Sequence, residues 1–161
     1  MKIKILNWIY LLSFILFLSD LLTNFDIKNQ FIKSFVYIFS TFGSILILGI
    51  NLKFKKSKFF LTLSIIGILL IFIIGPIKIL ILKSAWKTQT TLYENEHFNF
   101  KKVEFQMQDI GARGYNKRNV EVIYLTKLFM LTYKVPNDIK KHVEWIKVNK
   151  EVNELKLKYW K

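Results

Sequence analysis

The two arginines of the chain, Arg113 and Arg118, lie in one short segment, MQDIGARGYNKRNVEV, residues 107–122. Every other basic side chain among the 25 lysines and arginines is a lysine. A guanidinium presents a planar fork of donors that can hold a carboxylate or phosphate with two hydrogen bonds, whereas an ammonium acts as a point charge. The placement predicts a site for an anionic group, either an acidic patch on a partner protein or a phospholipid headgroup.

The segment around the arginines is predicted to be a hairpin loop. Residues 103–108 and 120–125 alternate apolar and polar side chains, which is typical of half-buried strands. Gly111 and Gly114 in the connection between them permit positive φ. Both arginines are therefore expected at the tip, where the candidate binding residues are Arg113, Tyr115, Lys117 and Arg118.

Two alternatives for the arginines stay open. The loop can be an ordinary solvated turn, or an arginine can pair with Asp109 or Glu121 and only hold the hairpin together. The letters GARG match a GxxG nucleic-acid clamp, but that clamp lies between helices and the flanks here are predicted strands. No nucleic-acid partner is expected.

No catalytic or metal-binding constellation is evident. Glu94, Glu96 and His97 stand together, but in a strand the two carboxylates share one face and the imidazole takes the other. His142 is expected at the end of a short helix or in a turn. The chain also lacks cysteine, which excludes thiolate ligands and cysteine nucleophiles. We expect no enzyme, no cofactor and no metal.

Asp20 is an acidic residue inside a hydrophobic segment. Ionisable groups in such segments are candidates for function or for pairing within the membrane. Lys33 and Lys78 are the cations expected near Asp20, and a structural ion pair is favoured over a role in ion transport.

Composition indicates a membrane protein. The 161 residues are 52% apolar and yet carry a formal net charge of +14. These two properties are compatible when apolar residues gather in lipid-facing blocks.

Three hydrophobic segments are predicted to cross the membrane: about 5–22, 31–52 and 59–82. The uncharged stretch between Lys33 and Lys53 would span roughly 28 Å as a helix, close to a hydrocarbon core. The first segment follows two lysines and has no small-residue cleavage site, so a retained signal anchor is expected. Gly75 and Pro76 predict a kink near the end of the third segment. The segments show no evident polar stripe.

The lysine distribution predicts the orientation. Four lysines between the second and third segments, with Lys2 and Lys4, place the N-terminus and this loop in the cytoplasm. Three crossings then put the C-terminal part outside, in a periplasm if the membrane is a bacterial inner membrane.

Residues 84–161 are predicted to form a small β-rich extramembrane domain that follows the helical region 1–83. Strands are expected around 103–107, 120–125, 128–133 and 143–148, with another at 154–160. A short helix is expected from Asp138 to His142. The predicted fold is thus α+β: three transmembrane helices, then a sheet of four or five strands.

These features favour a non-enzymatic integral membrane protein that displays a binding domain. The expected role is an accessory or assembly subunit of an envelope complex, with the lipid bilayer and either a membrane protein or further copies of the chain as partners. Three alternatives stay open: an immunity-type protein against a membrane-acting toxin, a small oligomeric transporter or channel, and an enzyme acting on lipid or cell wall.

Overall fold

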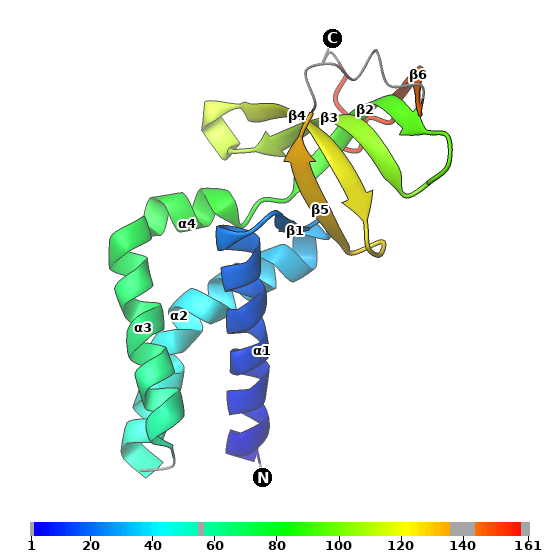
Figure 1. Cartoon of the computed structure of the whole chain (residues 1–161). Coiled ribbons are helices and arrows are strands. Elements are labelled where there is room, and N and C mark those ends of the chain that lie inside the picture. Colours follow the sequence, from blue (N-terminus) through cyan, green and yellow to red (C-terminus); the bar gives the residue numbers. More distant parts are fainter. Residues whose placement is uncertain (1, 55–56, 136–143, 159–161) are drawn as a thin grey trace. The chain divides into compact units, whose positions relative to one another are not determined.

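The computed structural model describes residues 2–54, 57–135 and 144–158. These residues form two compact units, a helical one and a sheet one (Figure 1). The helical unit contains the described residues up to Thr23 together with Gln30–Lys83. The sheet unit contains Asn24–Asn29 and the described residues from Ser84 onward. The short segment between the first two helices thus belongs to the sheet unit, although the sequence placed it in the helical region 1–83.

The helical unit follows the predicted hydrophobic segments. Its helices are α1 (Lys2–Leu22), α2 (Gln30–Phe54), α3 (Lys58–Ile74) and α4 (Pro76–Leu82). Helices at the three predicted places are confirmed. α1 and α2 are each long and apolar enough to cross a membrane, and α3 with α4 adds a third span if the bent pair counts as one.

The third hydrophobic segment breaks into two helices at Gly75. Gly75 has φ of 86°, a backbone conformation that glycine adopts without a steric penalty. Pro76 begins α4, where its missing amide hydrogen costs no helical hydrogen bond. The axes of α3 and α4 differ by 94°, so the two residues named for a kink lie at a sharp turn.

A line of buried polar side chains runs along α2, contrary to the expectation that the segments carry no polar stripe. Its members recur at intervals of three, four or seven residues, which places them on one side of a helix. They are Lys33, Tyr37, Ser40, Ser44 and Asn51.

This line, hereafter the polar seam, faces polar groups of the neighbouring helices. Asn7 of α1 and Asn51 exchange side-chain hydrogen bonds at 3.3 and 3.4 Å. The hydroxyls of Tyr10 and Ser44 lie 2.8 Å apart. Interhelical hydrogen bonds of this kind help hold helices together in lipid, where no water competes for the same groups.

The sheet unit is one antiparallel sheet of six strands in the order β1-β5-β4-β3-β2-β6. The strands are β1 (Phe25–Ile27), β2 (Trp86–Asn95), β3 (Lys101–Asp109), β4 (Tyr115–Tyr124), β5 (Phe129–Lys134) and β6 (Trp145–Glu151). Together with the helices they confirm an α+β fold.

The strands expected within 84–161 are found with one exception. The described part of the expected strand 154–160 is a turn region, because Asn153 and Lys156 adopt positive φ, which does not occur in a regular strand. The expected helix from Asp138 to His142 lies outside the described residues. Two strands, β1 and β2, were not anticipated. β1 has three residues, too few to show a strand pattern, and it forms by pairing with the distant β5. β2 is mostly polar and does not alternate apolar and polar residues.

Candidate functional site

One face of the sheet carries a continuous network of buried and half-buried polar side chains. Directly paired residues on adjacent strands point to the same side, and the registers place Arg118 beside Gln106, and both Asp26 and Tyr124 beside Met130. Hydrogen bonds then link side chains from β1 across the sheet to the segment after β6. The members are Asp26, Lys28, Thr88, Glu104, Gln106, Arg118, Tyr124 and Glu154.

Arg118 lies at one end of this network, where it bonds to Asp26 of β1. Its Nη2 donates to the Asp26 carboxylate at 2.6 Å, and its Nε and Nη2 donate to Oε1 of Gln106 at 3.0 and 2.8 Å. The guanidinium carbon also lies 4.1 Å from the ring centroid of Trp86. The planar group thus bonds along its edge and stacks on its face, which an ammonium cannot do.

Gln106 joins the arginine to the rest of the network. Its amide oxygen accepts from Arg118, and its amide nitrogen donates to Glu104 at 2.9 Å. The Glu104 carboxylate is 2% exposed and also accepts from the hydroxyls of Thr88 at 2.7 Å and Tyr124 at 2.8 Å. Three donors thus compensate for the loss of water around this carboxylate.

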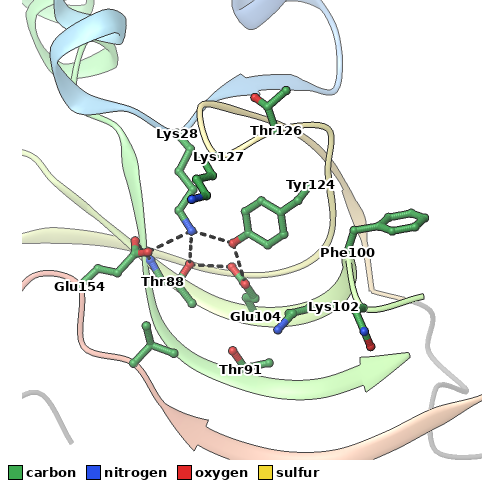
Figure 2. Close-up of a pocket in the computed structure, with 12 residues that line it drawn as sticks. Lys28, Thr88, Thr91, Phe100, Lys102, Glu104, Tyr124, Thr126, Lys127 and Glu154 are labelled. Carbon is green, nitrogen blue, oxygen red and sulfur yellow. Dashed lines mark hydrogen bonds and ion pairs between the residues drawn. The ribbon is translucent and has the colours of Figure 1, made fainter. Parts of the chain in front are cut away.

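Lys28 occupies the other end of the network, at the centre of Figure 2. Its ammonium donates to the Tyr124 hydroxyl at 2.8 Å and lies 3.0 Å from the Glu154 carboxylate. It also lies 4.5 Å from the centroid of the Tyr124 ring. Two side chains of the β1 segment therefore bond to the rest of the sheet unit. Asp26 accepts from Arg118, and Lys28 bonds to Tyr124 and Glu154.

The pKa values in this cluster favour one protonation state near neutral pH. Burial raises the pKa of Tyr124 to about 12, with the negative charge of Glu104 adding to the rise and Lys28 opposing it. Burial lowers the pKa of Lys28, but the attraction of Tyr124 and Glu154 outweighs burial, and the net shift is upward. Tyr124 is thus a neutral hydrogen-bond donor and Lys28 is a cation.

An open cavity of about 780 Å³ adjoins this cluster within the sheet unit (Figure 2). Its volume is in the range of small-molecule sites. Apolar surface comes from Phe100, Val152 and the Tyr124 ring. The lining residues are Lys28, Thr88, Thr91, Asn99, Phe100, Lys102, Glu104, Tyr124, Thr126, Lys127, Val152 and Glu154. We call this space the Lys28–Tyr124 cavity.

The four residues predicted to bind a partner do not all lie in one exposed group. Arg113 lies in a short 3-10 turn, Gly111–Arg113, and its side chain is exposed, as are those of Tyr115 and Lys117. Arg118 lies within β4 and bonds internally. The expectation that both arginines project from the tip is wrong for Arg118, because β4 begins at Tyr115. The internal alternative applies to Arg118, with Asp26 as its partner instead of Asp109 or Glu121.

The ion pair predicted for Asp20 forms with Lys33. Their charged groups lie 3.1 Å apart, with side chains 2% and 4% exposed, and the Tyr37 hydroxyl donates to the same Asp20 oxygen at 2.5 Å. Lys78, the other cation considered, is exposed on α4. Asp20 and Lys33 thus link α1 to the start of α2.

The Glu94–Glu96–His97 group forms no metal site among the residues that the structure describes. Glu94 pairs with Lys102 at 2.7 Å, and this hydrogen bond lowers the pKa of Glu94. The backbone amide of His97 donates to the Asn95 side chain in the turn after β2. His142 lies outside the described residues.

Sequence reasoning did not identify Asp26, Lys28, Glu104, Tyr124 or Glu154. Tyr124 and Glu104 were placed in predicted strands, but their partners lie on other strands or beyond the sheet. A usable pattern was the run of polar residues at every second position of β3, Glu104, Gln106 and Gln108, because a strand that buries such a face must supply hydrogen-bond partners.

Comparisons with protein-family models, curated proteins and solved structures found no match to this chain.

Proposed function

We propose that this chain is a membrane-anchored binding protein without catalytic activity. In this proposal the helical unit holds the chain in a bilayer, and the sheet unit, outside the cytoplasm, recognises a ligand or partner. The observation that carries the proposal is the Lys28–Tyr124 cavity, an open space bordered by a network whose polar groups already bond to one another. Such mutual bonding holds the cavity wall in one arrangement before anything binds, and so lowers the entropic cost of binding.

A role as an accessory subunit of an envelope complex is the finer form of this proposal. It is supported by the exposed side chains of Arg113, Tyr115 and Lys117, which we call the hairpin tip. Arginine and tyrosine are frequent among residues that dominate binding energy at protein interfaces. The tip would contact an acidic surface of a partner protein.

The test is purification of the tagged full-length protein from its native membrane in mild detergent. Quantitative proteomics would identify proteins present in stoichiometric amount, and native mass spectrometry would detect retained small molecules. We expect one or both, and we expect Arg113→Ala with Lys117→Ala to lose a protein partner. The matched control is Lys134→Ala with Lys147→Ala, which removes two exposed lysines elsewhere on the sheet unit.

The transport alternative makes the opposite prediction. If the protein is recovered as a bare homo-oligomer that conducts ions in reconstituted membranes, the binding proposal fails. The bonds of the polar seam support a structural role instead, since Asn7 with Asn51 and Tyr10 with Ser44 satisfy one another. An immunity-type role is a special case of binding, in which the co-purified partner is a toxin.

A further inference from the structure

Three lining residues of the Lys28–Tyr124 cavity have polar groups that the network does not engage. For Thr91, Asn99 and Lys127, no side-chain hydrogen bond or ion pair occurs with the residues that the structure describes. Thr91 is 4% exposed as a residue, and its hydroxyl lines the open cavity without a bond to these residues. A hydroxyl in this position is available to donate to or accept from a ligand.

The charges of the cavity favour an anionic ligand. Lys28, Lys102 and Lys127 line it together with two carboxylates, those of Glu104 and Glu154. Glu154 lies 3.0 Å from the Lys28 ammonium. Glu104 is enclosed by hydroxyl and amide donors. Lys102 pairs with Glu94. Glu104 keeps its negative charge, but it is 2% exposed, and so the exposed charge without a counter-ion among the described residues is that of Lys127, a cation.

The remaining wall is apolar and suits a hydrocarbon group. Phe100 and Val152 line the cavity, and their side chains are 50% and 42% exposed. Burial of such apolar surface against a ligand removes it from water and is favourable. Apolar surface beside the ammonium of Lys127 is the arrangement expected for an amphiphile.

We propose that the Lys28–Tyr124 cavity binds a small amphiphilic anion, a phosphate monoester joined to a short hydrocarbon body. Lys127 contacts the phosphate, and the Thr91 hydroxyl and Asn99 amide donate to its oxygens. The hydrocarbon lies against Phe100 and Val152. This inference rests on the proposed function and names its ligand class. The phosphate can come from a soluble ester or from the headgroup of an anionic phospholipid.

The experiment uses full-length protein in nanodiscs of zwitterionic lipid. The chain has no cysteine, so a fluorophore on Leu125→Cys, an exposed residue next to Thr126, reports on the cavity alone. The same fluorophore on Lys134→Cys is the control for binding elsewhere. Titration with octyl phosphate should give a saturable change at position 125 and none at 134. Octyltrimethylammonium, which carries the opposite charge, should bind at least tenfold more weakly.

Variants in the labelled protein assign the contacts. Lys127→Ala should weaken octyl phosphate binding about tenfold, since a hydrogen bond to a charged group and its attraction are lost. Thr91→Val, which removes the hydroxyl at nearly constant volume, should weaken it several-fold. Lys147→Ala, which removes an exposed lysine of β6, should leave the affinity unchanged.

The source of the phosphate is tested by changing the lipid. If a phospholipid headgroup is the ligand, nanodiscs containing phosphatidic acid alter the label at position 125 without any added probe, and Lys127→Ala removes the effect. If a soluble ester is the ligand, only octyl phosphate has an effect. Both outcomes support an anionic amphiphile.

Failure of this inference can be separated from failure of the proposed function. Equal or tighter binding of octyltrimethylammonium, or an unchanged affinity of Lys127→Ala for octyl phosphate, overturns the proposal of an anionic ligand. The proposal that the cavity binds a ligand would still stand. No response to any probe, together with no ligand or partner retained on purification, overturns both.

Discussion

Arg118 illustrates why this chain needs arginine at one position and not at the other. Its guanidinium bonds to Asp26 and to Gln106 and stacks on Trp86, so three groups depend on its planar shape. Arg113 lies in an exposed turn. A lysine at position 118 would therefore disturb several internal contacts, whereas a lysine at position 113 would replace an exposed side chain.

The Arg118→Lys variant should destabilise the sheet unit by about 1–3 kcal/mol, because Gln106 or Asp26 loses a charge-assisted bond in a partly buried place. Arg113→Lys should change stability by less than about 0.5 kcal/mol, the usual range for surface substitutions. Chemical denaturation of the full-length protein in detergent measures both. Equal stability of the two variants would show that the bonds of Arg118 to Asp26 and Gln106 do not stabilise the sheet unit.

The Tyr124 and Lys28 pair predicts a loss of stability at high pH. Both pKa values are raised in the folded chain, that of Tyr124 from 10.0 to about 12. The stabilisation is fully present below pH 10 and is lost as the pH rises from 10 toward 12, because the unfolded chain then releases these protons more readily.

Thermal unfolding of the full-length protein between pH 8 and 12 checks this prediction. Tyr124→Phe should lower stability at neutral pH, since Glu104 loses a donor. The unfolding temperature of this variant should also fall less steeply above pH 10 than that of the wild type. Parallel curves for the two proteins would show that Tyr124 does not control the decline.

At the scale of the elements, the polar seam determines how closely the helices approach. Gly67 of α3 faces Ser44 and Tyr10, and a Cβ at this position would lie 2.1 Å from the Ser44 hydroxyl. The absence of a side chain at 67 thus makes room for the Tyr10–Ser44 hydrogen bond. Gly49 on α2 has no such neighbour, since a Cβ there would meet nothing within 4 Å.

Gly67→Ala should therefore destabilise the helical unit by about 1–3 kcal/mol, the usual cost of overpacking. Gly49→Ala is the matched control and should be neutral or slightly stabilising, because alanine is the better helix former. Unfolding by sodium dodecyl sulfate in mixed micelles measures both variants. A neutral Gly67→Ala would argue against close packing at this point of the seam.

The Asp20–Lys33 pair makes a second prediction at this scale. Asp20→Asn removes the negative charge 3.1 Å from the buried Lys33 ammonium, and removing one partner of a buried pair costs about 3–5 kcal/mol. Adding Lys33→Met should recover part of that loss. Unfolding of the two variants in mixed micelles tests this. Unchanged stability of Asp20→Asn, with altered ion flux, would favour transport over packing.

At the scale of the whole molecule, the segment between α1 and α2 belongs to the sheet. Asn24–Asn29 forms β1 and carries Asp26 and Lys28, so the two units are joined by three chain connections: before β1, after β1 and before β2. The sheet unit is therefore not a separable C-terminal domain. Residues 84–161 expressed alone would lack an edge strand and two members of the polar network.

The orientation of the chain can be tested with single cysteines, because the natural sequence has none to interfere. Lys117→Cys on β4 should react with a membrane-impermeant maleimide added to intact cells or spheroplasts. Lys53→Cys near the end of α2 should react only after the membrane is permeabilised. Both side chains are exposed in the folded chain, so burial would not explain a difference. The reverse pattern would place the sheet unit in the cytoplasm.

The helices and most strands were predictable because their patterns are local. An uninterrupted apolar run or a period of two residues can be recognised within a window of about 10 to 20 positions. The break at Gly75 and Pro76 is local in the same sense, since proline removes a donor within its own helix. The polar seam was also present in the sequence, as the spacing of Lys33, Tyr37, Ser40, Ser44 and Asn51, but most of the residues between them are apolar.

The sequence by itself therefore determined the kinds of element, their order and the apolar character of the first part. Only the tertiary structure decided where the chemistry lies. The sequence separation is 92 residues for Asp26 and Arg118 and 96 for Lys28 and Tyr124, and neither pair is marked by any local pattern. β1 forms only because β5 offers it an unpaired edge. Long-range pairing depends on the complete fold, and so the cavity and its network could be found only once the sheet was assembled.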